Sequence, residues 1–589
     1  MSPLIKDVVV LCSSTPARSD RSAHEIALFL GAETTLVSLS PAALRDGESV
    51  RTLVPQCSCL IVAAETLASA AEAMPLGVGG LASLTTDVAP RVFVYGFQPT
   101  DRHRAVLRHL SSSALLGVHP RPDGNGRFRM SEGHPEWCGP FSGLSLDTVS
   151  TLGEQCFLEG PGDHARTTII RCGDEPFFVR IMRGSSQLFF SASPELADLD
   201  DSVPRPARPL SWFSRLMPLM MFLRGTLGDR VWHNNTPRAC FIIDDPLLKN
   251  RHGFLEYKRL VEVMHRERFS TCIAFIPWNY RRSNRAVAAL LASRQPGVPS
   301  LCVHGCDHSD AEFETTDVDV LRGRAQTALD RMEAHRRLSA VPFDDVMVFP
   351  RGRFSAQAVA ALKASGFLAT VNGDVWPLNM PHTLRDLLEV AVTRFSDFPL
   401  FSRRYPRDLA EFAFDMFMGK PVLTAEHHGY FRDGYGALTT FVEQLRRLDP
   451  RLEWSNLATI CSTACLTRTT AEGNKHVQFY ASRFWMRNNG PHEQTYTLFR
   501  RIGRDASLPR VTVNGRETGC DRNEDRVRIV LSLESGQAAD IRVGPEATRD
   551  ADTPWRATTI QNAGVGARRL LAEFRDNYVD TTRVLFSRS

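Results

Sequence analysis

Residues 238–308 decide the fold of the middle of this chain, because they hold two apolar runs that end in groups able to bind a metal. The first run is ACFIIDDP (residues 239–246), and the second is LCVHGCDH (residues 301–308). Such runs are typical of buried strands that deliver polar side chains to the C-terminal mouth of an α/β sheet or barrel.

One aspartate and two histidines of these runs form a three-ligand set for a divalent cation. Asp245, His304 and His308 leave coordination positions open, as a catalytic ion needs and a structural ion does not. The remaining carboxylate, Asp244, is then free to act as a base. A lone Asp-Asp is usually a solvated turn or helix cap, so the interpretation depends on both runs together.

The surrounding residues 237–457 alternate between apolar runs and helix-like stretches, which predicts a parallel (β/α) barrel. Its expected strands are residues 241–243, 271–276, 301–303, 346–349, 369–371, 389–392 and 422–424. Trp278 and Tyr280 follow the second of these strands and are therefore expected at the mouth. They could stack on sugar rings or pack in the core, and the sequence favours neither.

The segments before the barrel predict a separate α/β region. Residues 1–200 begin with alternating strands and helices typical of a doubly wound, flavodoxin-like or amidotransferase-like accessory domain, and they lack the glycine pattern of dinucleotide binding. Residues 201–236 predict a proline-containing linker followed by an apolar helix at 212–223. We expect this helix to pack against the next domain, with membrane-surface contact as the alternative.

The segments after the barrel change character. Residues 458–545 contain short alternating strands broken by turns, which predicts a small β-sandwich, and Asn514-Gly515 is a strong hairpin signal. Residues 546–589 predict a C-terminal tail with a short helix at 567–574. The 589 residues are thus expected to form a multidomain α/β protein with about three to four domains.

Composition excludes several classes of function. The chain has 70 Lys and Arg against 66 Asp and Glu, for a net charge of +4, without a concentrated basic stripe, so nucleic-acid binding is not expected. Most of the 13 cysteines lie in apolar runs, which indicates reduced buried thiols. No apolar run approaches the roughly 20 residues of a transmembrane helix, and no secretory signal is recognised; we expect a cytoplasmic protein.

Four motifs in order resemble those of the polysaccharide deacetylase superfamily, carbohydrate esterase family four with NodB-type homology. They are IDD (243–245), HGCDH (304–308), FPRG (349–352) and EHH (426–428), all in the middle domain. The resemblance implies a deformed (β/α) barrel, Asp244 as general base, and a divalent ion, with zinc favoured, on Asp245, His304 and His308.

The resemblance also implies roles for residues farther along the chain. Either His427 or His428 would protonate the leaving group, and alternation along a strand lets only one of them face the mouth. Arg351 stands where the family has an arginine that pairs with the catalytic acid. Asp374 with Trp376 is similar to the Asp and Trp wall of the family's substrate site.

Three departures from the family pattern bear on the substrate. Gly305 stands where the family usually has Ser or Thr, which removes a hydroxyl that would brace the loop. Pro246 replaces a common Gly and withdraws a backbone N–H. The family's Arg-Pro-Tyr type motif is rearranged to FPRGRF at residues 349–354.

The main hypothesis is a metal-dependent hydrolase that removes an N- or O-acetyl group from a carbohydrate or polysaccharide precursor. One alternative keeps the barrel and metal but cleaves a non-sugar amide or a glycosidic bond. Another is a non-catalytic glycan-binding or assembly protein. The flanking domains are expected to serve contacts within a homo-oligomer or a biosynthetic complex.

Overall fold

The computed structural model describes eight stretches of the chain, residues 6–45, 54–121, 125–149, 154–161, 166–293, 299–504, 506–544 and 559–579. The chain divides into two compact units. The first contains Met1–His233, Thr383–Leu388 and Arg468–Glu472. The second contains Asn234–His382, Glu389–Thr467 and Gly473–Ser589.

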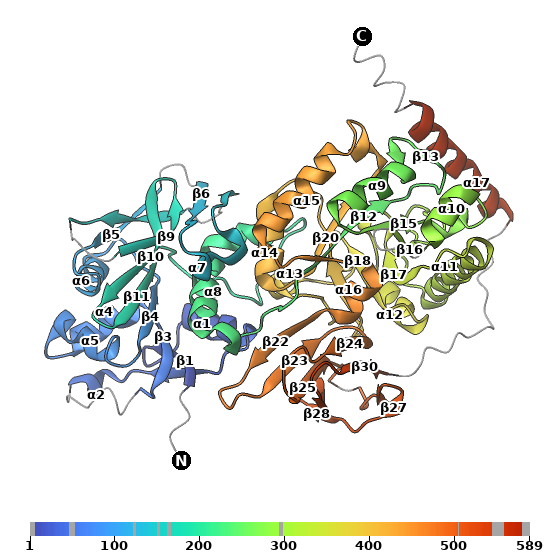
Figure 1. Cartoon of the computed structure of the whole chain (residues 1–589). Coiled ribbons are helices and arrows are strands. Elements are labelled where there is room, and N and C mark those ends of the chain that lie inside the picture. Colours follow the sequence, from blue (N-terminus) through green and yellow to red (C-terminus); the bar gives the residue numbers. More distant parts are fainter. Residues whose placement is uncertain are drawn as a thin grey trace, which may run out of the picture. The chain divides into compact units, whose positions relative to one another are not determined.

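The first unit is built on a nine-stranded mixed sheet (Figure 1). Five strands run parallel, in the order β2 (Thr34–Ser38), β1 (Lys6–Cys12), β3 (Cys57–Ala63), β4 (Arg91–Tyr95) and β11 (Ser186–Ser191). The sheet continues antiparallel through β10 (Glu175–Arg183), β9 (Arg166–Cys172), β6 (Asn125–Met130) and β7 (Ser145–Val149). This antiparallel half departs from the doubly wound parallel sheet predicted for residues 1–200. A separate two-stranded antiparallel sheet pairs β5 (Leu115–Pro120) with β8 (Gln155–Glu159).

The helices of the first unit are mostly short. In the described residues they are α1 (Arg18–Phe29), α2 (Pro41–Arg45), α4 (Ala64–Ala73), α5 (Leu81–Leu84), α6 (Asp101–Leu110), α7 (Pro135–Cys138), α8 (Phe213–Leu227) and α13 (Leu384–Leu388). Across the described residues, no single helix has the length and apolar character to cross a membrane. One bent pair, Ala64–Ala73 with Gly77–Leu84 at 110°, passes the same test together.

Helix α8 contains the apolar segment that the sequence predicted would pack on the following domain. Within its own unit it packs on the sheet, where the Phe222 ring lies 5.3 Å from Phe93 and 5.0 Å from Phe189, centroid to centroid. The packing of this helix on the following domain stays a prediction. The sequence of a helix that is apolar on most of its faces predicts that the helix is buried, but it does not predict which surface the helix packs against.

We predict that Phe222→Ala destabilises the first unit by about 3–5 kcal/mol, because it removes a fully buried ring between two others. Urea unfolding followed by near-UV circular dichroism measures this loss. Leu28→Ala in α1, at a side chain that is 45% exposed, is the matched control and should change the unfolding free energy by about 1 kcal/mol or less. Equal losses in both variants would contradict the described packing.

The second unit contains a curled parallel sheet with helices outside it (Figure 1). Its order is β19-β18-β17-β16-β15-β12-β20, and β21 pairs with β12. A parallel bridge between Arg404, just after β19, and Thr424 in β20 brings the two edges together. The strands are β12 (Arg238–Asp244), β15 (Thr271–Phe275), β16 (Ser300–His304), β17 (Asp344–Val348), β18 (Ala369–Asn372), β19 (Leu400–Ser402), β20 (Val422–Glu426) and β21 (Glu453–Trp454).

Six of the seven expected strands of this sheet lie on observed strands, and one does not. Residues 389–392 were expected to form a strand, but Val392 makes only an isolated antiparallel bridge to Leu400. The strand at this place is β19, only three residues long. Helices between the strands are α9 (Tyr257–Glu267), α10 (Arg285–Ala292), α11 (Val318–Ser339), α12 (Ala356–Ala364), α14 (Leu409–Met418), α15 (Gly436–Leu448) and α16 (Leu457–Thr463).

Two further sheets follow and share one core, in which Phe479 and Phe484 stack with ring centroids 4.7 Å apart. Asn514 and Gly515 both have positive φ, at 51° and 79°, and form the turn between β26 and β27, as the Asn-Gly pair predicts. One sheet has the order β22 (Cys465–Thr469), β23 (Lys475–Phe479), β25 (Gln494–Arg501), β29 (Arg526–Leu533) and β28 (Asp521–Asn523). The other has the order β24 (Arg483–Arg487), β30 (Ala538–Val543), β26 (Val511–Val513) and β27 (Arg516–Glu517).

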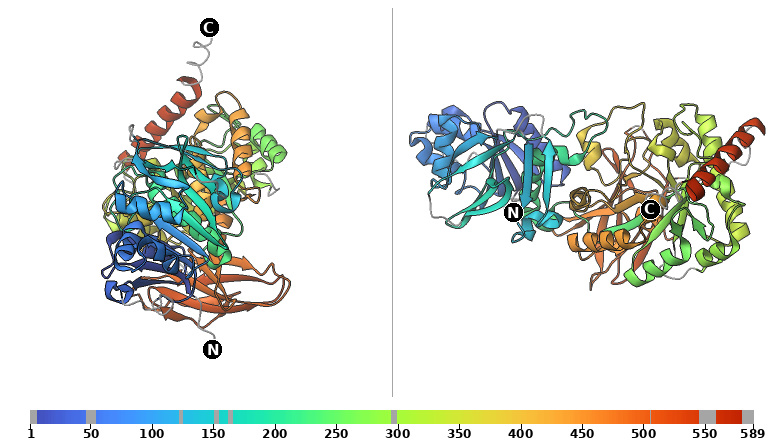
Figure 2. Two further views of the ribbon diagram at one scale, coloured as in Figure 1. Left: turned by 90° about the vertical axis from the view of Figure 1, so that its left-hand side faces the viewer. Right: turned by 90° about the horizontal axis from the view of Figure 1, so that it is seen from above.

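The last described segment is the helix α17 (Thr559–Phe574), which continues as a π-helical turn at Arg575–Val579. It is longer than the helix expected at 567–574. Figure 2 shows it in red at the periphery in both views. Glu573 forms ion pairs with Lys249 and Arg282, so the segment contacts the loops that follow β12 and β15.

Candidate metal centre

The candidate metal ligands come from the C-terminal ends of two strands of the curled sheet. β12 ends at Asp244, and Asp245 follows with φ of 52°, its N–H donating to the carbonyl of Ala274. β16 ends at His304, and the loop after it returns to place His308 beside it. Since β12 and β16 both pair in parallel with β15, their C-terminal ends open at one edge.

Asp245, His304 and His308 form a compact donor set. One ligand atom from each lies within 4.8 Å of the others, and His308 Nε2 is 3.6 Å from Asp245 Oδ2. The two imidazole rings meet edge to face at 4.8 Å between centroids. The side chains of Asp245 and His308 are 29% and 16% exposed, so the set is open toward solvent.

The protonation of the two histidines suits a metal. His304 Nδ1 lies 3.0 Å from the carbonyl of Val348, which can only accept, so Nδ1 carries the proton and Nε2 keeps its lone pair. Burial lowers the pKa of His304, and burial together with the neighbouring His304 brings the pKa of His308 to about 3. Both imidazoles are therefore neutral at pH 7, and two neutral nitrogens with one carboxylate fit zinc.

Asp244 is held by a buried arginine. Arg403 donates from both terminal nitrogens to the two oxygens of Asp244, each at 2.7 Å, and both side chains are less than 10% exposed. Burial alone would raise the pKa of Asp244, but the charge of Arg403 and its hydrogen bonds bring it to about 2. Asp244 is therefore ionised and fixed in orientation next to Asp245.

The structure does not bring Arg351 to this carboxylate. Its guanidinium pairs with Asp310 at 2.5 Å, and both side chains are more than 60% exposed. The resemblance implies that Arg351 pairs with the catalytic carboxylate; in the structure the partner of Asp244 is Arg403. Arg403 follows β19, a short strand that the sequence did not predict, and the Ser402-Arg403-Arg404 run after an apolar pair is the signal that could have identified it.

His427 and His428 face different surroundings. His427 follows β20, is exposed, and its charge contributes to the low pKa of Asp244. His428 points elsewhere: its ring lies edge to face with that of His252 at 5.3 Å, and its Nε2 is 3.7 Å from Asp576 Oδ1. The structure thus associates His427, and not His428, with the Asp244 side of the mouth.

The four expected substrate residues divide into two pairs. Trp278 and Tyr280 are half-buried and belong to the loop after β15, where arginine side chains stack on both rings. Trp376 is buried and stacked on His382, with centroids 4.1 Å apart and planes 8° apart, so its ring faces cannot receive a sugar. Asp374 is exposed in the loop after β18.

Glu312 fixes the loop that carries the two histidines. Its Oε1 accepts from the N–H groups of Cys306 and Asp307, at 3.1 and 2.6 Å. Gly305 has φ of +63°, and a Cβ there would lie 2.5 Å from both Glu312 and Pro350. The carboxylate therefore braces this loop in place of a hydroxyl after His304, and no side chain fits at position 305.

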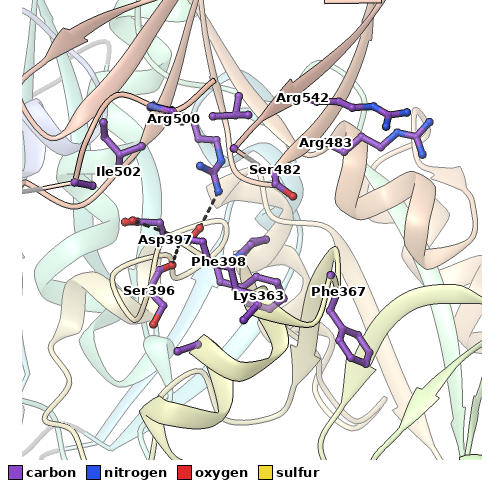
Figure 3. A pocket seen from close by; sticks show the side chains of 18 of the residues that line it. Lys363, Phe367, Ser396, Asp397, Phe398, Ser482, Arg483, Arg500, Ile502 and Arg542 are labelled. Carbon is purple, nitrogen blue, oxygen red and sulfur yellow. Dashed lines mark hydrogen bonds and ion pairs between the residues drawn. The ribbon is translucent and has the colours of Figure 1, made fainter. Parts of the chain in front are cut away.

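A cavity of about 1030 Å³ lies elsewhere in the second unit, between α12 and the two sheets that follow the curled sheet (Figure 3). Its cations are engaged, since Lys363 donates to the carbonyl of Ser396 and Arg500 to that of Asp397. None of the candidate metal ligands lines it, so its size does not bear on the chemistry of the metal centre.

Comparisons with known proteins give remote similarities only. No family model and no curated protein matches the sequence. The fold is similar to that of Agd3, described as a novel carbohydrate deacetylase, with 9% identity, a TM-score of 0.48, and coverage of 92% of this chain and 99% of that chain. It is also similar to a family 4 carbohydrate esterase from Streptomyces lividans in complex with acetate (10% identity, TM-score 0.24, 38% of this chain and 94% of that one).

A third similar structure is a CE4 family pseudoenzyme from Bacillus anthracis, with 12% identity, a TM-score of 0.25, and coverage of 39% of this chain and 66% of that chain. The neighbours thus include both carbohydrate deacetylases and a protein named as a pseudoenzyme. At such identities and scores, function has to be argued from this chain's own side chains.

We predict that Arg403→Met destabilises the second unit by about 3–5 kcal/mol, because it leaves the Asp244 carboxylate buried without its partner. Chemical unfolding measures the loss, and adding Asp244→Asn should recover part of it. Arg351→Met is the matched control and should cost at most about 1 kcal/mol, since its ion pair is exposed. A larger loss in the control would contradict the assignment of Arg403.

We predict a pH-dependent contribution of Glu312 to stability. Burial raises the pKa of Glu312 from 4.5 to about 7, so the folded protein binds this proton more tightly than the unfolded chain. The stabilisation is complete below pH 4.5, falls as the pH rises to about 7, and is then constant. In Glu312→Gln, metal-stripped protein should lose this slope between pH 4.5 and 7.

The comparison is made by measuring unfolding free energies of wild type and variant at several pH values. Glu314→Gln serves as the control, because Glu314 pairs with Arg353 at the surface, and its profile should follow the wild type. An unchanged slope in Glu312→Gln would show that Glu312 does not bind the extra proton.

Proposed function

We propose that the second unit is a divalent-metal-dependent hydrolase that removes an acyl group from a carbohydrate. The observation that carries the proposal is the donor set Asp245, His304 and His308 beside the ionised carboxylate of Asp244. Three protein ligands that include two neutral imidazoles are typical of catalytic zinc sites, which keep a position open for water or substrate. When bound there, such an ion would lower the pKa of a water molecule and polarise an acyl carbonyl.

Asp244 has the properties of the proton acceptor in this reaction. Its two oxygens are fixed by Arg403, so the carboxylate does not have to reorganise when a proton arrives. With a pKa of about 2 it is ionised at every physiological pH, but it is also a weak base. It therefore suits the removal of a proton from an acidified water and not from an ordinary alcohol.

His427 is our candidate for the proton donor to the leaving group. It is exposed at the C-terminal end of β20, which pairs directly with β12, the strand that delivers Asp244. His428 is excluded from this role in our proposal, because its ring is turned toward His252 and Asp576. The leaving nitrogen or oxygen of the sugar would take its proton from His427.

Recognition of the sugar would fall to Trp278 and Tyr280. Both rings follow β15 and are half-buried, with an arginine over each ring, whereas Trp376 is buried as well as stacked on His382. Aromatic side chains at a strand end can stack on a sugar ring while leaving its hydroxyl groups to polar partners. A carbohydrate carrying an N- or O-acetyl group is therefore the substrate class we favour.

We predict that metal-loaded protein releases acetate from acetylated oligosaccharides, and that Asp244→Asn lowers kcat about 10²–10⁴-fold while the bound metal remains. Asp245→Ala and His308→Ala should instead lose metal and activity together. Acetate release and elemental analysis on the same samples measure both effects. Asp310→Asn, an exposed carboxylate two residues after His308, is the matched control and should leave both unchanged.

Other products would identify other functions. Sugar fragments without acetate would mean glycoside cleavage on the same site, and turnover of simple amides alone would mean a non-sugar substrate. Glycan binding that survives Asp244→Asn, with no turnover at any metal, would mean a non-catalytic glycan-binding protein. Absence of bound divalent metal at Asp245, His304 and His308 would contradict the proposal as a whole.

A further inference from the structure

A second group of metal-binding side chains lies beside the candidate metal centre. His252, His428 and Asp576 each offer one ligand atom, and these atoms lie within 4.8 Å of one another. His252 Nε2 is 3.7 Å from Asp576 Oδ2, and His428 Nε2 is 3.7 Å from Asp576 Oδ1. The proposed hydrolysis uses none of the three.

Both Nε2 atoms face the Asp576 carboxylate at 3.7 Å, a separation longer than an ordinary hydrogen bond. Both Nδ1 atoms are buried without a hydrogen-bond partner among the described residues. Zinc bonds of 2.0–2.1 Å place neighbouring ligand atoms about 3.4 Å apart in a tetrahedron. The observed separations are close to this value and to the 3.6 Å between His308 and Asp245 in the candidate metal centre.

A third group of this kind serves as a contrast. Cys306, Asp307 and Glu312 also lie within 4.8 Å of one another, but Glu312 accepts two backbone N–H groups and Arg331 donates to Asp307 at 2.5 Å. Protein contacts therefore account for the carboxylates of that group. In the described residues, the imidazoles of His252 and His428 instead face a shared carboxylate, that of Asp576, at 3.7 Å each.

Space and charge around the second group permit a cation. A cavity of about 30 Å³, enough for at least one water-sized particle, is lined by Asp245, His252 and Asp576 among others. Three carboxylates and three arginines surround it, so the local charge is balanced. Arg575 pairs with Asp576 Oδ1 at 2.7 Å, and the carboxylate oxygens retain further lone pairs. The lining charged residues are Asp245, Arg282, Arg569, Glu573, Arg575 and Asp576.

Asp576 reaches this place because the C-terminal segment docks on the loops of the curled sheet. Asn577 Oδ1 accepts from the N–H of Gly253 at 2.8 Å, and Glu573 pairs with Lys249 and Arg282. Gly253 has φ of +56°, and a Cβ there would lie 2.2 Å from His428 Nδ1, so its backbone lies directly against the imidazole. The same arrangement places Arg569 of α17 in the cavity lining next to Asp245.

We propose that His252, His428 and Asp576 bind a second divalent cation of the zinc class, which fastens the C-terminal segment 559–579 next to the candidate metal centre. Two ligands come from the loops after β12 and β20, and the third comes from the segment itself. The cation therefore binds the docked arrangement and not the released one. At a free concentration about 100 times its Kd it multiplies the ratio of docked to released segment about 100-fold.

Zinc equilibrium dialysis of the full-length chain tests the proposal. His308→Ala removes the candidate centre's ion and should leave one equivalent, which disappears when Asp576→Asn or His252→Ala is added. Because this count is made without the candidate centre, it is independent of the proposed hydrolase activity. Retention of that equivalent in both double variants would overturn the proposal.

Limited trypsinolysis at Arg568, Arg569 and Arg575 measures docking of the segment. In the His308→Ala background, saturating zinc should slow this cleavage about 100-fold, and Asp576→Asn should abolish the protection. Gly253→Ala, which displaces the His428 ring without removing a ligand, should weaken zinc binding as well. Glu573→Gln is the control, since it loosens docking but should retain the equivalent of zinc; protection that is independent of zinc would overturn the proposal.

Discussion

The buried ion pair between Asp244 and Arg403 is the interaction on which the candidate centre depends. It joins the end of β12 to the residue after β19, two strands that do not pair with each other. A buried pair of this kind is costly to break, because either partner alone would be a charge without compensation. The pair therefore fixes the orientation of the Asp244 carboxylate, and it lies where the curled sheet brings its edges together at Arg404 and Thr424.

The position of the candidate ligands at one mouth could be predicted from sequence because each lies at or near the end of an apolar run. Asp244 ends one buried strand with Asp245 directly after it, and His304 ends another, so strand ends alone bring these side chains to one edge. Arg403 could not be found in this way. Its strand has only three residues, and its partner lies 159 positions earlier in the chain. Arg351 was assigned from its place in a motif, but the structure shows its side chain at the surface.

Packing details account for the other differences between expectation and structure. An apolar run such as that in α8 indicates burial, whereas the partner surface is set by tertiary contacts that leave no periodic signal. The same holds for the aromatics, where Trp278 is half-buried at the mouth and Trp376 is stacked on His382. The C-terminal segment was predicted as a tail, and only the three-dimensional arrangement brings Asp576 to His252 and His428. The sequence thus predicts which side chains lie at the end of a strand. It predicts less well which side chains reach the same place from distant segments of the chain.

The proposed function requires a divalent ion bound by Asp245, His304 and His308 while Asp244 stays paired with Arg403. Anomalous diffraction at the zinc edge from crystals of the zinc-loaded, full-length chain tests it most directly. We expect a zinc peak coordinated by one oxygen of Asp245 and by Nε2 of His304, with His308 as the third protein ligand. Asp244 should remain uncoordinated, with both oxygens on the Arg403 guanidinium. A zinc ion coordinated by Asp244, or no zinc among these side chains, would contradict it.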